Sequence, residues 1–182
     1  MRTLILIIMS TFYLQGCNNS NQEIEYFDSI YLPVQEIIDL DTEIQENISA
    51  LLISEEELAL LDDSMSIEDE EINTKDIEIQ MFELKEYVNK CKQNLENITV
   101  IENEYNLKQS YDHLLTAYLL EINTNWPKLI SLLNTDNISE EEMELFNTLL
   151  QKTHFNLDKN LSKFYDIAEY YASRHNIEIE KE

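Results

Sequence analysis

Apolar residues recur every three or four positions along most of the chain, which is the spacing of one face of an α-helix. This pattern predicts helices over residues 23–52, 55–61, 75–122, 127–134 and 139–175. The apolar phase shifts near residues 99–106, which marks a candidate break in the third helix. No stretch has the alternating pattern of a strand. We therefore expect an all-α fold, an elongated antiparallel bundle of three or four long, partly bent helices.

Several residues mark where these helices begin or bend. Ser139 and Glu142 have the spacing of a capping box at the start of the last helix. Thr74 is a candidate N-cap for the helix that begins at residue 75. Pro33 lies inside the first helix and has no N–H to donate. We expect it either to kink that helix or to occupy the first turn of a second one.

The chain contains a single glycine, Gly16. Residues with left-handed backbone conformation must therefore be asparagine or aspartate, the next most tolerant types. We expect such positions around Asn73, Asn123 and 134–137.

The N-terminal segment has the order of a signal peptide. Arg2 is followed by an apolar run, LILIIMSTFYL, that is shorter than the ~20 residues needed to span a bilayer but suits a signal-peptide core. The run ends in Leu14-Gln15-Gly16-Cys17, which resembles the bacterial lipobox. The resemblance implies cleavage between Gly16 and Cys17 and a diacylglycerol on the Cys17 sulfur. The alternative is an ordinary secretory signal or an uncleaved anchor.

These features divide the chain into three parts. We expect residues 1–16 to be a removed signal peptide, 17–22 to be the lipidated cysteine with a short polar tether, and 23–178 to be one acidic helical domain. The lipid would hold that domain at the outer face of the cell membrane or of an outer membrane. Two or more acyl chains anchor a protein stably, whereas one does so only marginally.

The mature chain is strongly acidic. Loss of residues 1–16 removes Arg2 and no acid, so the net charge changes from −25 to −26. Residues 18–74 contain 17 acids and no Lys, Arg or His. A field of this sign repels nucleic acid, which we exclude as a partner, and it also repels anionic lipid.

The sequence offers weak candidates for chemistry, and for each we favour a structural role. Cys91 would be the lone thiol once Cys17 is lipidated, and its helical spacing with Leu84, Val88 and Leu95 indicates a core residue. The acidic segment 62–73 could bind calcium weakly, but it lacks the glycine of an EF-hand loop and is more typical of a solvated loop.

Residues of a hydrolase triad occur together as Ser110, Asp112 and His113, but neighbours on one helix point in different directions. His154 and His175 have no partner at metal-ligand spacing. We therefore predict no catalytic, cofactor or metal site, and no enzymatic activity. Most aromatic residues fall on the core stripes; those most worth testing for exposure are Trp126, Tyr170 and Tyr171.

The stretch Tyr105 to Leu120 (YNLKQSYDHLLTAYLL), a short helix ending in Leu132-Leu133-Asn134 and a long final helix follow in this order. The arrangement is similar to the C-terminal half of the cell-wall-binding helical lipoproteins of Gram-positive bacteria. The resemblance implies an extracellular bundle without catalytic residues, although an acidic chain departs from the lysine-rich composition that suits an anionic wall polymer.

Together these features predict a non-enzymatic binding or spacer module at the cell envelope, with the wall or an envelope protein as partner. The alternatives are a cation-responsive or small-ligand-binding lipoprotein, and an exclusion or immunity lipoprotein acting on a neighbouring membrane protein.

Overall fold

The computed structural model describes residues 2–52, 73–135 and 138–179. These residues contain no strand and form five helices: α1 (Arg2–Leu52), α3 (Thr74–Asn97), α4 (Leu107–Thr124), α5 (Trp126–Leu133) and α6 (Glu140–His175). The prediction of an all-α bundle is confirmed. The predicted helix 55–61 lies outside the described residues, as does nearly all of the acidic segment 62–73.

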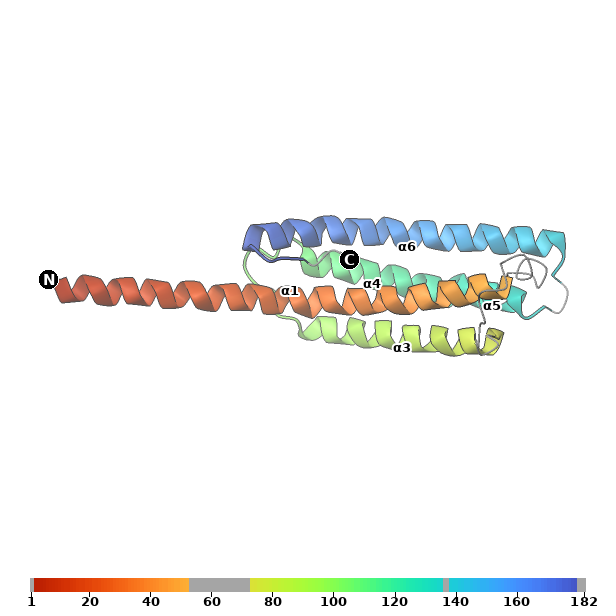
Figure 1. Ribbon diagram of the computed structural model, residues 1–182, viewed down its shortest axis with the longest axis horizontal. Coiled ribbons are helices and arrows are strands. Elements are labelled where there is room, and N and C mark those ends of the chain that lie inside the picture. Colours follow the sequence, from red (N-terminus) through yellow and green to blue (C-terminus); the bar gives the residue numbers. More distant parts are fainter. Residues whose placement is uncertain (1, 53–72, 136–137, 180–182) are drawn as a thin grey trace, which may run out of the picture.

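The long helices run alternately up and down, so that sequence neighbours are antiparallel (Figure 1). α1 packs mainly against α3, and α4 packs most extensively against α6. Residues 98–106 and the last turn of α6 lie at one end of the bundle, and the first part of α1 projects beyond that end (Figure 1). We call this end the proximal end. The result is an elongated molecule with its core along the long axis.

α1 differs from the expected first helix at its beginning. It starts at Arg2 rather than at residue 23, so residues 17–22, expected to form a tether, are helical in the full-length chain. No proline or glycine lies between Asn18 and Leu32, so nothing in this stretch interrupts helical hydrogen bonding. Pro33 lies inside α1 and does not begin a second helix.

The candidate break in the third predicted helix corresponds to residues 98–106, which separate α3 from α4. Left-handed residues in the described chain are Asn103, Tyr105, Asn106 and Asn176, with φ between 51° and 66°. Asparagine does take most of these positions, as expected, but the predicted positions Asn73, Asn123 and Asn134 are not among them, and residues 136–137 lie outside the described residues. Asn73 instead has extended φ of −126° and caps α3.

Among the described helices, α3 and α6 begin with capping boxes. Ser139 accepts a hydrogen bond from the Glu142 N–H, and the Glu142 carboxylate accepts one from the Ser139 N–H, so this predicted box is confirmed. At α3 the cap is Asn73 rather than Thr74, because the Asn73 side chain accepts from two backbone N–H groups and Asp76 closes the box.

The α4–α5 junction is a bend rather than a turn. The Asn125 N–H still donates to the Glu121 carbonyl, but Pro127 has no N–H for the next step of the helix. Trp126, one of the residues worth testing for exposure, is completely buried at this bend. Burial of a large apolar side chain contributes ~1.5–3 kcal/mol or more, which stabilises the core at this bend, although the Trp126 indole N–H has no hydrogen-bond partner among the described residues.

Most of the predicted apolar stripes form the core. Buried residues of α3 include Leu84, Val88 and Cys91. The clearest exception is in α1, where Ile24 is 41 % exposed and Tyr26 is buried instead. Tyr26 can be buried because its hydroxyl donates to Glu104 Oε2 at 2.7 Å.

Candidate functional site

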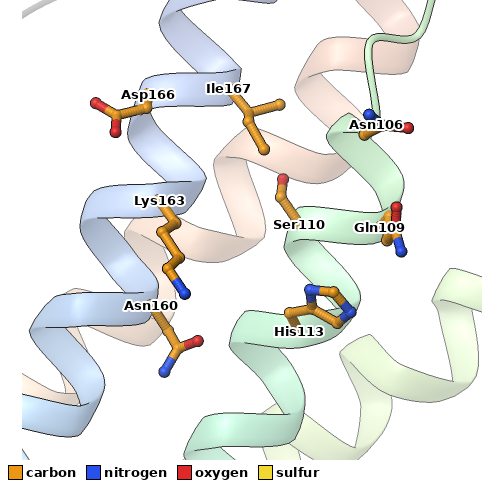
Figure 2. Close-up of a pocket in the computed structure, with 8 residues that line it drawn as sticks. All are labelled: Asn106, Gln109, Ser110, His113, Asn160, Lys163, Asp166 and Ile167. Carbon is orange, nitrogen blue, oxygen red and sulfur yellow. The ribbon is translucent and has the colours of Figure 1, made fainter.

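A depression of about 370 Å³ lies between α4 and α6 (Figure 2). Its lining side chains come from both helices: Asn106, Gln109, Ser110, His113, Asn160, Lys163, Asp166 and Ile167. Lys163 points across the groove between the helices, whereas the Asp166 carboxylate points away from α4 (Figure 2). Within the described part of the chain, neither Lys163 nor His113 forms a hydrogen bond or ion pair. The depression therefore presents positive and amide groups that can bind an anionic or polar group.

The triad-like residues divide between two faces of α4. Ser110 is buried, and its hydroxyl donates to the Leu107 carbonyl at 2.8 Å. Asp112 faces α3, where its carboxylate lies 2.6 Å from Lys92 Nζ. His113 lines the depression toward α6 (Figure 2). Asp112 therefore cannot orient His113, because its carboxylate is committed to a different helix.

His175 holds three segments together at the proximal end. Its Nδ1 lies 3.2 Å from Glu23 Oε2 of α1, and its Nε2 lies 3.4 Å from the Asn103 carbonyl. The ring packs on Tyr171 at a centroid distance of 4.3 Å. In the sequence, His175 has no partner at metal-ligand spacing, and nothing there marks it as a contact residue. The partners Glu23 and Asn103 are far away in sequence, so no spacing pattern could reveal this contact.

Aromatic rings surround His175. Tyr26 and Phe27 of α1 each lie 5.8 Å from Tyr171, and Tyr105 lies 5.1 Å from Tyr170. Burial raises the pKa of Tyr171, and its hydroxyl donates to the Glu23 carbonyl at 3.1 Å. Of the three aromatics worth testing, only Tyr170 is exposed, at 47 %. The cluster rigidifies the proximal end.

Among the described residues, two carboxylates are buried, and neither was singled out from the sequence. Asp41 Oδ2 accepts from Gln45 at 3.0 Å and from the Tyr118 hydroxyl at 3.4 Å, while Oδ1 has no hydrogen-bond partner. Desolvation raises the pKa of Asp41 to about 6. Asp41 falls on the α1 core stripe between Ile37 and Ile44, so spacing alone could have identified it.

The second buried carboxylate belongs to Glu121 of α4. It accepts hydrogen bonds from Asn125 at 2.6 Å, Asn156 at 2.9 Å and Thr153 at 3.2 Å. All three donors are neutral, so the network ties α6 to the α4–α5 bend without a counter-charge. Such donors offset the cost of burying a carboxylate.

The two remaining candidates have structural surroundings. Cys91 is 5 % exposed, as its position on the stripe indicated, and burial raises the pKa of its thiol. A buried thiol with raised pKa is a poor nucleophile. His154 is half-buried, and its Nε2 has no hydrogen-bond partner in the described residues.

No group of three or more His, Cys, Asp or Glu side chains among the described residues is arranged to hold a metal ion. No described helix contains a stretch long and apolar enough to cross a membrane.

Comparison with family models, curated proteins and solved structures finds no match for this chain. The fold therefore defines its class as an acidic, elongated antiparallel helical bundle.

Proposed function

We propose that this chain is a lipoprotein, anchored to the outer face of a membrane through Cys17, whose bundle acts as a non-enzymatic binding or spacer module at the cell envelope. The observation that carries the proposal is the placement of the lipobox-like Leu14-Gln15-Gly16-Cys17 directly before the bundle. Cys17 precedes Glu23, which contacts His175 at the proximal end, by six residues of α1. At 1.5 Å per residue this is ~9 Å.

A lipid on Cys17 would therefore hold the proximal end close to the membrane. The bundle would extend away from the surface by about the length of α6, which at 36 residues is ~54 Å. Electrostatics alone would not hold an acidic chain at an anionic lipid surface. A spacer role follows from the rod shape, and a binding role from the exposed faces of α1, α4 and α6.

The test replaces Cys17 with serine and follows the protein in its native host. The unchanged chain should incorporate a clickable fatty acid and sediment with membranes, whereas Cys17→Ser should be unlabelled and leave the membrane fraction. Cys91→Ser is the matched control, because it removes the other thiol and should leave both readouts unchanged. Membrane association of an unlabelled Cys17→Ser protein would refute the lipid anchor.

A second candidate function is small-ligand or cation binding by the same anchored domain. The depression with Lys163 and His113 favours a small anionic ligand, and the acid-only first part of the chain favours a cation. This candidate requires that millimolar calcium or a small carboxylate such as acetate raise the melting temperature. If neither does, the candidate is wrong.

A further inference from the structure

The positive charges of α6 lie on one exposed stripe. All four Lys and Arg residues of this helix are exposed. At 100° per residue, the four bases fall within about 60° of the helix circumference, and they fall within about 100° when two exposed aromatics are included. We call this the basic stripe, and its members are Lys152, Phe155, Lys159, Lys163, Tyr170 and Arg174. Phe155 is 68 % exposed, an unusual fraction for a large apolar side chain in the middle of a helix.

Few carboxylates accompany these charges. Between Glu144 and Arg174, only Asp166 lies on the same face of α6. Within the described part of the chain, Lys152, Lys159 and Lys163 form no ion pair or hydrogen bond. In a chain of net charge −25, this stripe is a local reversal of sign that the protein itself does not neutralise.

α1 carries a stripe of the opposite sign. Its outward face between residues 25 and 46 has six acids and no base, all within about 80° of the helix circumference. We call this the acidic stripe, and its members are Glu25, Asp28, Glu36, Asp39, Glu43 and Glu46. Asp28 is half-buried, and the other five are exposed.

The two stripes cannot pair within one molecule. The α6 residues that contact α1, such as Tyr165, Tyr171 and His175, lie about 100° or more around α6 from the centre of the basic stripe. The basic stripe therefore faces away from α1. On α1, Glu43 accepts a hydrogen bond from Gln80 of α3 at 2.8 Å, and the rest of the acidic stripe is exposed except for half-buried Asp28.

The stripes nevertheless lie at the same height along the long axis. Three contacts between the antiparallel helices α1 and α6 define this height: Glu23 with His175, Phe27 with Tyr171, and Gln35 with Tyr165. In each pair the two residue numbers add up to between 198 and 200. Residue numbers rise along α1 in the direction in which they fall along α6, so residues of the two helices with this sum lie at the same height.

The charged residues obey the same rule. For each base of the basic stripe, the acidic stripe contains one acid at the same height, such that the two residue numbers add up to 198 or 199. The resulting pairs are Arg174 with Glu25, Lys163 with Glu36, Lys159 with Asp39, and Lys152 with Glu46. Two copies standing side by side with their proximal ends level would thus bring all four pairs into register without sliding along the axis.

We propose that the basic stripe of α6 binds the acidic stripe of α1 on a second copy of this chain, so that copies associate side by side. The contact is heterologous, and repetition gives rows or closed rings. The level alignment rests on the proposed function, because a common anchor plane imposes it. The contact itself requires only two copies.

The expected affinity is low. Exposed ion pairs contribute ~0–1 kcal/mol each, and the copies also repel through their net charge. At ~0.15 M salt the Debye length is ~8 Å, which screens distant repulsion more than the contact pairs. Tethering raises the effective concentration to about the millimolar range. We therefore expect association on the membrane, or in concentrated solution.

The test is cross-linking of full-length double-cysteine variants with a short bis-maleimide, in membranes and with purified protein at about millimolar concentration. Asp39→Cys with Lys159→Cys should give a ladder of multimers, and so should Glu46→Cys with Lys152→Cys. Single-cysteine variants should give no ladder. The matched control is Glu86→Cys with Lys159→Cys, which should give no ladder. Glu86 is an exposed acid of α3. It lies at nearly the height of Asp39, because the hydrogen bond between Asn47 and Gln80 fixes how the antiparallel helices α1 and α3 are aligned.

A charge swap tests the pairing itself. With the 46/152 cysteines as reporter, Lys159→Glu should lower the ladder yield about fivefold, in line with an exposed pair of ~1 kcal/mol. Adding Asp39→Lys should restore it, whereas adding Glu86→Lys should not. Circular dichroism should show that all variants keep their helicity.

Three outcomes would overturn the association: no ladder in either setting, an equal ladder from the Glu86 control, or a ladder that disappears when anionic wall polymer is removed. The last would make the polymer the partner of α6. Fractionation of the same cells keeps the two proposals apart. Soluble protein that still forms the ladder refutes only the anchor, and membrane-bound protein without a ladder refutes only the association.

Discussion

Replacing Asp41 with asparagine should stabilise this protein at neutral pH and reduce the dependence of its stability on pH. Asp41 is only 6 % exposed, and burial raises its pKa from 3.8 to about 6. A carboxyl whose pKa is higher in the folded state binds more protons there than in the unfolded state. Its contribution therefore favours folding at low pH, and is lost as pH rises through the window between the two values.

The size of the effect follows from the two pKa values. A tenfold change in proton affinity corresponds to ~1.4 kcal/mol, so ionised Asp41 costs about 3 kcal/mol of folding stability above pH 7. Asparagine removes this cost, but its amide NH2 group would take the place of the Asp41 Oδ1 atom, which has no hydrogen-bond partner. An unsatisfied buried donor costs ~1–3 kcal/mol. We expect Asp41→Asn to gain about 1–2 kcal/mol at pH 7.5.

The pH dependence of the difference is the sharper quantity, because the cost of the unpaired amide does not titrate. The advantage of Asp41→Asn should grow by about 1.4 kcal/mol between pH 5 and pH 7.5. Urea unfolding followed by circular dichroism measures it. This range avoids the isoelectric point near 4.2, where the chain would precipitate.

Asp39→Asn is the matched control, because it removes the same charge from the exposed side of α1. It should leave stability nearly unchanged across this range. An equal pH dependence in both variants would mean that long-range repulsion, not desolvation of Asp41, controls stability. A flat difference for Asp41→Asn would mean that the carboxyl is not buried as described.

Two further substitutions test local features of the bundle by the same unfolding assay. Pro33→Ala should stabilise the protein by about 2–3 kcal/mol, because it restores an N–H inside α1. The control is Leu32→Ala, which changes an exposed neighbour and should alter stability little. A loss of stability in Pro33→Ala would mean that α1 depends on a bend at residue 33. Asn156→Ala should cost about 1.5–3 kcal/mol of stability, because buried Glu121 loses a hydrogen-bond donor at 2.9 Å. The control is Asn147→Ala, which changes an exposed asparagine of the same helix. Equal losses of stability in the two variants would refute the Glu121 network.

The helical periodicity of the sequence is sufficient to predict most of the core. The stripe through Leu84, Val88 and Cys91 fails nowhere in α3, because a helix that packs on one side needs one apolar face. The same rule misplaces Ile24 and misses Tyr26 at the proximal end. There the chain buries a phenol by giving it the Glu104 carboxylate as partner, and that partner comes from a loop whose path periodicity cannot predict.

The buried carboxylates show a different limit. Asp41 and Glu121 both occupy core positions, and their spacing was visible in the sequence. Hydropathy nevertheless assigns any carboxylate to the surface, since burying one is costly unless donors reach it. For Glu121 those donors are Asn156 and Thr153 of α6, which only the packing of α4 on α6 brings together.

The stripes of α1 and α6 are invisible in the order of charges along the chain, because each stripe forms only when the residues are placed around a helix. Counted along the chain, the first part of the protein is acidic and the last part is mixed, which suggests only a repulsive surface. Placed on helices, the same residues separate into an acidic face on α1 and a basic face on α6. Their common height depends on the Glu23–His175 contact, which no sequence pattern reveals. On our proposal, a chain of net charge −25 can therefore still present a surface complementary to its own copy, provided that the copies are held close together and level.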